Sequence, residues 1–423
     1  MNNNFFTLCL SLMLTSIAAQ PNLGSISGVD SLYDPLVHSA HFNDGSNTVA
    51  FPLFIIDQKE RYFFEFDLLE GPPRRLYYTF RYYDRNWNES PVDILEIVDG
   101  LNELEINQFQ TSFNTYTPYV HYNLSLLPRA LNFRQSGNYL LVVYDQEGNI
   151  YLTRKIYITT PLFTSTINFI QPTDPRKIST HQSLSVVINS ANYNVIDVKK
   201  EVQLEVIQNG NIENRIILNE PLFFSGNNLR FTKVDAILFP AGKEFHSVDI
   251  RSIQRKGPGV RYWDEEKGEF HCYAYTDVMR REKNYLLTFD YNGKIAYTSS
   301  DVPLEFARTR SEYVYLHLSL ASPEKLDKDV YVFGQISDWK IKDEFKMTYD
   351  PVAKMYKTKV YVKNAWVDYA YVTLDDHLKA DLSEIDGDWS DAENDYFILC
   401  YYRPFGGRFD NLMLGNKINS NRN

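Results

Sequence analysis

Cysteine is scarce in this chain, with three residues in a length of 423. Cys9 lies in the apolar N-terminal run, and Cys272 and Cys400 are far apart in the sequence. So few cysteines exclude a disulfide framework, and there is no Cys-x-x-Cys pair to indicate a metal site. For Cys272 and Cys400 we favour two inert buried thiols over one disulfide.

Positive charge is also in deficit. The chain has 43 Lys and Arg against 54 Asp and Glu, which gives a net charge of −11. A protein that binds nucleic acid needs a basic surface, and anionic lipid repels an acidic protein. The composition therefore argues against both kinds of partner.

Motifs of catalysis and cofactor binding are missing. The sequence contains no His-Glu-x-x-His, no glycine-rich phosphate loop and no Gly-x-Ser-x-Gly turn. His38 and His41, with Asp44, would supply only part of a metal site, so we favour exposed loop histidines. The acidic run "DGDWSDAEND" at residues 386–395 lacks the Gly and Glu of a calcium-binding loop, which favours a solvated loop. Paired carboxylates for glycoside hydrolysis stay open as the weaker alternative, and we expect no enzyme, no metal and no cofactor.

Long hydrophobic runs are confined to the N-terminus. "FFTLCLSLMLTSIAA" at residues 5–19 carries no charge and closes on Ala18 and Ala19. We predict a secretory signal peptide over residues 1–19, cut near Gln20, with a buried N-terminal strand as the alternative. No later run reaches membrane-spanning length, so we expect an exported protein without a membrane span.

Aromatic residues, in contrast, are abundant at 15% of the chain, and period-2 alternation dominates. In "RYFFEFDLL" Tyr62, Phe64 and Phe66 share one face, and in "MYKTKVYVK" lysines oppose the apolar residues. Hairpin turns are expected at three places: Asn209-Gly210, Asn292-Gly293 and Glu147-Gly148-Asn149. No long stretch has a helical period, so the pattern predicts an all-β protein.

Two breaks divide the pattern of strands. Pro161 follows one clear strand, and Pro303 lies in a polar stretch that precedes a new run of strands. We predict tandem immunoglobulin-like β-sandwich domains at residues 20–160, 161–302 and 303–423.

The stretch "VYVFGQISDWKIKDEFKMTYDPVAKMYKTKVYVK" at residues 330–363 resembles the small β-sandwich modules that bind starch and glycogen. In such a module Trp339, with Trp366, would form a platform on which sugar rings stack. Packing of Trp339 at the edge of the core is the interpretation that we favour, followed by protein contact and then by glycan binding. A shared fold does not transfer function.

Several further stretches together resemble one family. "LYYTFRYYDRNWNES" (76–90), "QTSFNTYTPYVHYNLSL" (110–126) and "SGNYLLVVYDQEGN" (136–149) follow the family's order. "FPAGKEFHSVDIRSI" (239–253) and above all "GDWSDAENDYFILCYYRPFGGRFDNL" (387–412) complete it. This family is the plug protein of the type IX secretion system of Bacteroidetes-type bacteria, and the resemblance extends over residues 21–420. Where the family commonly has His-Cys in the first block, this chain has Tyr82-Tyr83, which argues against thiol or imidazole chemistry there.

The resemblance implies a periplasmic protein, peripheral to the inner face of the outer membrane. It would dock on the mouth of the large outer-membrane β-barrel translocon and close the channel when no substrate is passing. A periplasmic glycan-binding protein is the alternative function.

Six residues are candidates for contact with that partner, because Trp, Tyr and Arg dominate binding energy at interfaces: Trp87, Trp339, Tyr401, Tyr402, Arg403 and Arg408. For the two arginines we favour an internal role, in which they pair with Asp410 or with a carboxylate of residues 386–395.

Overall fold

The computed structural model describes residues 23–46, 48–56, 62–126 and 131–421. The predicted signal peptide and Cys9 lie outside these residues. Strands make up 46% of the structure and helices 6%, which confirms an all-β protein; the immunoglobulin-like detail stays a prediction. In the described ranges no helix has the length and apolar character needed to cross a membrane.

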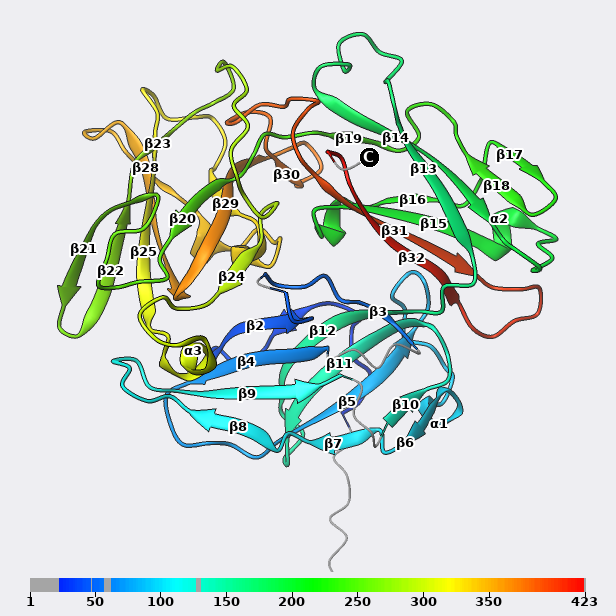
Figure 1. The fold of residues 1–423 in the computed structure, drawn as a ribbon, viewed down its shortest axis with the longest axis horizontal. Helices are drawn as coiled ribbons and strands as arrows, with labels where there is room; N and C mark the ends of the chain where they lie inside the picture. The colour runs from blue at the N-terminus through cyan, green and yellow to red at the C-terminus, as the bar shows by residue number, and fades with distance from the viewer. Residues whose placement is uncertain (1–22, 47, 57–61, 127–130, 422–423) are drawn as a thin grey trace, which may run out of the picture.

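The first sandwich lies at the bottom of Figure 1, in blue to teal. One sheet has the order β1-β12-β11-β5-β7, with β3 on β12, and the other has the order β2-β4-β9-β8. The first sheet contains β1 (Ser31–Leu32), β3 (Leu53–Ile55), β5 (Leu76–Tyr83), β7 (Glu103–Glu105), β11 (Gly137–Asp145) and β12 (Ile150–Thr159). The second contains β2 (Val37–Asn43), β4 (Phe63–Leu69), β8 (Gln108–Thr111) and β9 (Tyr119–Ser125). Beside them lie α1 (Ile94–Ile97), β6 (Val98–Gly100) and β10 (Leu131–Phe133).

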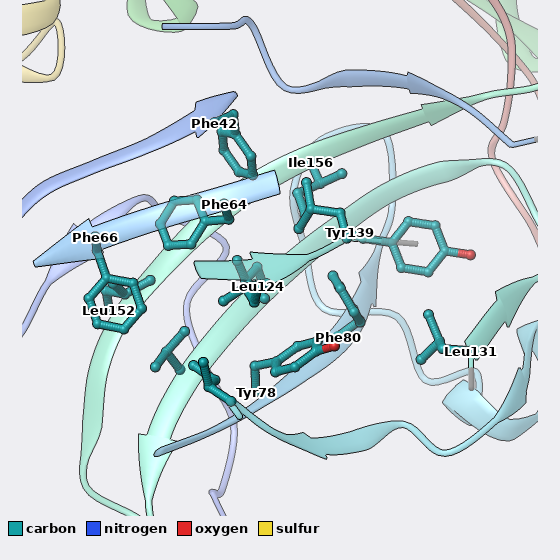
Figure 2. Close-up of a cluster of buried hydrophobic side chains, with 14 of the residues drawn as sticks. Phe42, Phe64, Phe66, Tyr78, Phe80, Leu124, Leu131, Tyr139, Leu152 and Ile156 are labelled. Carbon is teal, nitrogen blue, oxygen red and sulfur yellow. The ribbon is translucent and has the colours of Figure 1, made fainter. Parts of the chain in front are cut away.

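The core of this sandwich follows from the alternation in β4. Phe64 and Phe66 point into the space between the two sheets and are fully buried (Figure 2). Tyr62 packs against the same cluster, as predicted. Glu65 and Asp67 occupy the opposite face of β4, yet they are also buried. Since a half-exposed strand would place such carboxylates in water, another part of the chain must cover them.

The second sandwich lies at the upper right of Figure 1. Its sheets have the orders β13-β14-β18-β17, with β19 on β14, and β16-β15-β31-β32. The first contains β13 (Thr164–Ile170), β14 (His181–Asn189), β17 (Phe223–Ser225), β18 (Asn228–Phe231) and β19 (Leu238–Pro240). The second contains β15 (Val202–Gln208), β16 (Ile216–Leu218), β31 (Asp395–Tyr402) and β32 (Asn411–Asn419). Two short helices accompany them, α2 (Val198–Glu201) and η1 (Ile212–Asn214).

The third sandwich lies at the upper left of Figure 1. Its sheets have the orders β20-β29-β24, with β26 and β30 on β29, and β21-β22-β25-β28-β27, with β23 on β25. The first contains β20 (His246–Asp249), β24 (Ile295–Tyr297), β26 (Tyr331–Phe333), β29 (Ala365–Leu374) and β30 (Ala380–Asp381). The second contains β21 (Val260–Glu266), β22 (Glu269–Ala274), β23 (Asp277–Val278), β25 (Tyr313–Ala321), β27 (Thr348–Asp350) and β28 (Met355–Lys363). The short helices are η2 (Leu304–Phe306), α3 (Ala307–Arg310), η3 (Gln335–Ser337) and η4 (Asp343–Phe345).

Strand pairing corrects the predicted boundary between residues 302 and 303, because pairs cross it in both directions. β15 of the second sandwich pairs with β31 near the C-terminus, and β20 and β24 pair with β29 of the third. The third sandwich is therefore inserted between strands of the second. Alternation shows which face of a strand is apolar but not which distant strand pairs with it, so the sequence could not reveal this insertion.

Two of the three expected hairpins are present. β11 and β12 pair around residues 147–149, and β15 pairs with β16 beyond Asn209-Gly210. The prediction of a hairpin at Asn292-Gly293 was wrong, because residues 284–291 form no strand. Cys272 and Cys400 are buried free thiols, as favoured.

Candidate partner interface at the C-terminal hairpin

The most specific sequence block forms a hairpin of β31, a loop at residues 403–410, and β32. The loop turns tightly, since the amide of Gly407 donates to the carbonyl of Pro404 at 2.7 Å. A Cβ on Gly407 would lie 2.8 Å from that carbonyl oxygen, so the turn requires glycine here. The loop therefore has one well-defined shape on which side chains are displayed.

Strand β31 is buried on both faces, so both candidate tyrosines on it lie in the interior. Tyr402 points into the core of the second sandwich, and its hydroxyl donates to the carbonyl of Asn194 at 3.2 Å. Tyr401 points the other way, into a core shared with the first sandwich, where its hydroxyl donates to Asn138 Oδ1 at 2.8 Å. Tyr401 is 0% exposed and Tyr402 is 6% exposed. The two rings are interior packing and offer a partner almost no surface.

Arg403 is an internal clamp, the role that we favoured. Its Nε donates to Asp410 Oδ1 at 2.8 Å, and a second guanidinium nitrogen bonds the other oxygen. Asp410 is 1% exposed and also accepts the amide of Arg85 at 3.0 Å. The amide of Arg403 donates to the carbonyl of Glu201 at 2.7 Å. One buried carboxylate thus ties the loop to the first sandwich, and the backbone of Arg403 ties it to the second.

Arg408 forms a different pair from those considered. Its guanidinium donates to both carboxylate oxygens of Glu96, at 2.9 and 3.1 Å. The Arg408 side chain is 60% exposed, so screening makes this surface pair weak. Arg408 therefore remains available at the surface.

Trp87 belongs to the shared core as well. It is 7% exposed, its ring meets Tyr157 edge to face at 5.3 Å, and the ammonium of Lys155 lies 4.8 Å from the ring centroid. The blocks at residues 76–90 and 387–412, far apart in sequence, therefore meet at one seam. Sequence reasoning singled out both blocks but had no signal that they touch.

Trp339 is no surface platform. It is 8% exposed and packs edge to face against Phe333 and Phe245, at 5.5 and 6.0 Å between ring centroids. Its indole nitrogen donates to Gln335 Oε1 at 3.3 Å. Core packing, the favoured interpretation, accounts for this residue. Trp366 is half-buried, and its indole nitrogen donates to Asp368 Oδ1 at 2.8 Å.

The sequence missed the most exposed apolar side chain of the loop. Phe405 is 87% exposed and lies in the sequence between Arg403 and Arg408. The available signal was a phenylalanine within "RPFGG", because a large apolar residue in a tight turn has no core to enter. Phe405 and Arg408 are the residues of this loop that a partner could contact.

The acidic run at residues 386–395 is not a solvated loop, so that prediction was wrong. Asp386 is 1% exposed and lies 2.9 Å from Arg280 Nε and 3.1 Å from His246 Nε2. Burial alone would lower the pKa of His246, but Asp386 and Asp277 raise it to about 9. At the end of the run Asp395 pairs with Lys294 at 2.7 Å and with Lys417 at 2.9 Å. These carboxylates are used in internal ion pairs.

His38 and His41 are likewise not loop residues. Both lie on β2 and are half-buried, and burial lowers the pKa of each imidazole. His41 Nδ1 lies 2.7 Å from the carbonyl of Ser39. Their place between the first and third sandwiches makes them part of a seam.

That seam explains the buried carboxylates of β4. Asp67 Oδ2 accepts from Lys363 Nζ at 2.6 Å and from the hydroxyl of Tyr313 at 2.7 Å, while Oδ1 lies 2.8 Å from His121 Nδ1. Burial would raise the pKa of Asp67, but Lys363 and His121 hold it at about 2. Lys363, expected on the open face of its strand, is only 5% exposed. The third sandwich therefore covers the polar face of the first through an ion-pair network.

These features define an all-β protein of three sandwiches, locked by one apolar seam and one ionic seam. Residues 37–160 match the model of the Type 9 secretion system plug protein 1st domain, which confirms the predicted resemblance over that range. A crystal structure of a hypothetical protein from Parabacteroides merdae ATCC 43184 has the same fold, with a TM-score of 0.88 and 23% identity over 94% of this chain and 100% of that one. No curated protein matches the chain.

Proposed function

We propose that this protein is a periplasmic component of a type IX secretion system that docks on the mouth of the outer-membrane translocon and seals it when no substrate is passing. The observation that carries the proposal is the match of residues 37–160 to the first domain of the plug protein. The protein would work at the inner face of the outer membrane without spanning it.

A stopper must keep its shape against a wide channel, and the two seams supply stiffness. Between the first and second sandwiches the apolar face of β11 and β12 packs on β31 and β32, with Leu140, Val142, Leu399 and Leu412 buried. Between the first and third, Asp67 and its partners are buried and hydrogen-bonded. An apolar interface restricts the relative motion that is usual between domains, and the buried ion-pair network ties the first sandwich to the third, so both seams favour a rigid body over a flexible one.

The loop at residues 403–410 is the docking contact that we propose. Its clamp on Asp410 fixes the backbone, so Phe405 is presented with little entropy left to lose on binding. Phenylalanine and arginine are both enriched at protein interfaces, and arginine is enriched among the residues that dominate binding energy. Phe405 would supply apolar area, and Arg408 would exchange Glu96 for a carboxylate of the translocon.

The test is a pull-down of the translocon from detergent-solubilised outer membrane with the tagged protein. We expect the wild type to recover the translocon and Phe405→Asp to lose it while its melting temperature is unchanged. Val352→Asp is the matched control, because Val352 is also an exposed apolar residue, 93% accessible, on a turn of the third sandwich. A wild type that recovers no translocon refutes the proposed function, and a Phe405→Asp variant that binds as well as Val352→Asp refutes the docking contact alone.

A further inference from the structure

A pocket of about 310 Å³ lies at the junction of the second and third sandwiches. Strands β19 and β30, labelled at the top of Figure 1, both contribute to its wall. Its volume lies at the lower end of the range of about 300–1,000 Å³ that small-molecule pockets span, which suits a ligand of one or two small rings. Neither the plug role nor the candidate interface uses this pocket.

Three aromatic side chains line one part of the pocket: Phe245, Phe333 and Trp339. The Trp339 ring is held by an unusual backbone, because Asp338 and Trp339 both have positive φ values, of 55° and 56°. A Cβ at Gly293 would lie 2.6 Å from the indole, so glycine is needed for the ring to sit where it does. Two consecutive left-handed residues without glycine cost energy that the surroundings must offset, and the result is an apolar wall.

Three carboxylates, those of Asp375, Asp381 and Asp388, line another part of the pocket, and in each of them only Oδ1 accepts a hydrogen bond from the described residues. Asp381 Oδ1 accepts from the amide and the hydroxyl of Ser383, at 2.8 and 2.6 Å, and Asp388 Oδ1 accepts the amide of Gly242 at 2.8 Å. Among the described residues, neither Oδ2 has a hydrogen-bond donor or a cation at ion-pair distance. Burial raises the pKa of Asp388, and the charge of Asp381 adds to this. Donors also line the pocket: Lys379, several amide side chains, and the ammonium of Lys243, which already donates to the carbonyls of Arg280 and Lys283 at 2.6 and 2.9 Å. The pocket therefore offers a ligand both acceptors and donors.

We propose that this pocket binds a neutral sugar ring. The C–H groups of a pyranose would lie against the accessible edges of Trp339 and Phe245, which are 8% and 7% exposed, and its hydroxyl groups would donate to Oδ2 of Asp381 and of Asp388. The three carboxylates of the lining outnumber its two ammonium groups, Lys243 and Lys379, which disfavours an anionic ligand, and a wholly apolar ligand would leave these polar groups unsatisfied. This pocket is separate from the loop at residues 403–410. The proposal of sugar binding therefore does not depend on whether the protein docks on the translocon.

The test is saturation-transfer NMR followed by calorimetry on the full chain. The probes are the methyl glycosides of glucose, galactose, mannose and N-acetylglucosamine, together with maltose and cellobiose. We expect saturable binding of at least one sugar, and a loss of about tenfold or more in Asp381→Asn/Asp388→Asn, since each hydrogen bond to a charged acceptor is worth about that factor. Asp376→Asn is the matched control, because Asp376 is exposed beside the pocket but does not line it; it should bind as the wild type does.

Three results would overturn the proposal. The first is that no sugar of the panel binds, and the second is that the double variant binds as tightly as Asp376→Asn, which places binding elsewhere. The third is that ethanolamine binds in the pocket and no sugar does, which makes this a site for a cationic amine. Melting curves of both variants show whether each one is folded, so that a folding defect is distinguished from a loss of binding.

Discussion

The fully buried carboxyl group of Glu205 should weaken this fold at alkaline pH, and Glu205→Gln should restore stability there. Glu205 is 0% exposed, on β15 beside the seam between the first and second sandwiches. Both its carboxylate oxygens lack a hydrogen bond within the described chain. Arg215 Nε lies 3.3 Å from Oε1, but the geometry is not that of a hydrogen bond. Burial raises the pKa of Glu205 from 4.5 to about 7, although Arg215 and Lys155 oppose this.

The sign and size of the effect follow from linkage. Since the folded state holds the proton more tightly than the unfolded chain, stability falls as pH rises from the unfolded pKa to the folded one. The cost is below about 1 kcal/mol at pH 5 and reaches about 3 kcal/mol at pH 8, because each pKa unit is worth about 1.4 kcal/mol. Glutamine has the same shape and cannot ionise. We therefore expect the free energy of unfolding of Glu205→Gln to exceed that of the wild type by about 3 kcal/mol at pH 8 and by less than about 1 kcal/mol at pH 5.

Urea unfolding followed by tryptophan fluorescence at pH 5, 6, 7 and 8 measures this difference. Glu213→Gln is the control, because Glu213 is a nearby exposed glutamate whose replacement should give a difference near zero at every pH. A Glu205→Gln variant that is less stable than the wild type at pH 8, or one whose gain does not change with pH, would refute the reasoning.

Three further predictions concern the seams and the thiols. Arg403→Ala should lower the free energy of unfolding by about 2–3 kcal/mol, because it removes the two-bonded partner of the buried Asp410 and leaves that carboxylate only the amide of Arg85 and its guanidinium at 3.7 Å; Arg403→Ala/Asp410→Ala should recover part of this loss in thermal melts. Lys363→Met should cost about 3–5 kcal/mol, because it removes the cation of a buried pair; a loss below about 1 kcal/mol in urea titration would mean that the ionic seam contributes little. Burial raises the pKa of Cys272 and of Cys400 to about 12, so a thiol reagent at pH 8 should label neither cysteine until denaturant is added, and rapid labelling of the native protein would contradict their burial.

The sequence by itself determined the fold class and the faces of single strands. Period-2 alternation placed Phe64 and Phe66 in a core because a strand exposes alternate residues to opposite sides. The resemblance to the plug protein, predicted for residues 21–420, is confirmed over residues 37–160, because aromatic strands and turn residues leave a readable local pattern. The pairing of Arg403 with Asp410 could also be predicted from the sequence, because the two residues are seven positions apart on one hairpin.

Only the tertiary structure decided what lies against the second face of a strand. The alternation of β4 placed Glu65 and Asp67 opposite Phe64, but it did not show that the third sandwich covers them and pairs Asp67 with Lys363. For the same reason Tyr401 looked like a surface residue, although it is fully buried. Burial on a second face, strand pairing across an inserted sandwich and the pocket between two sandwiches all depend on contacts between segments far apart in the chain. Such contacts leave no period in the local sequence, because packing energy depends on which surfaces meet and not on their order along the chain.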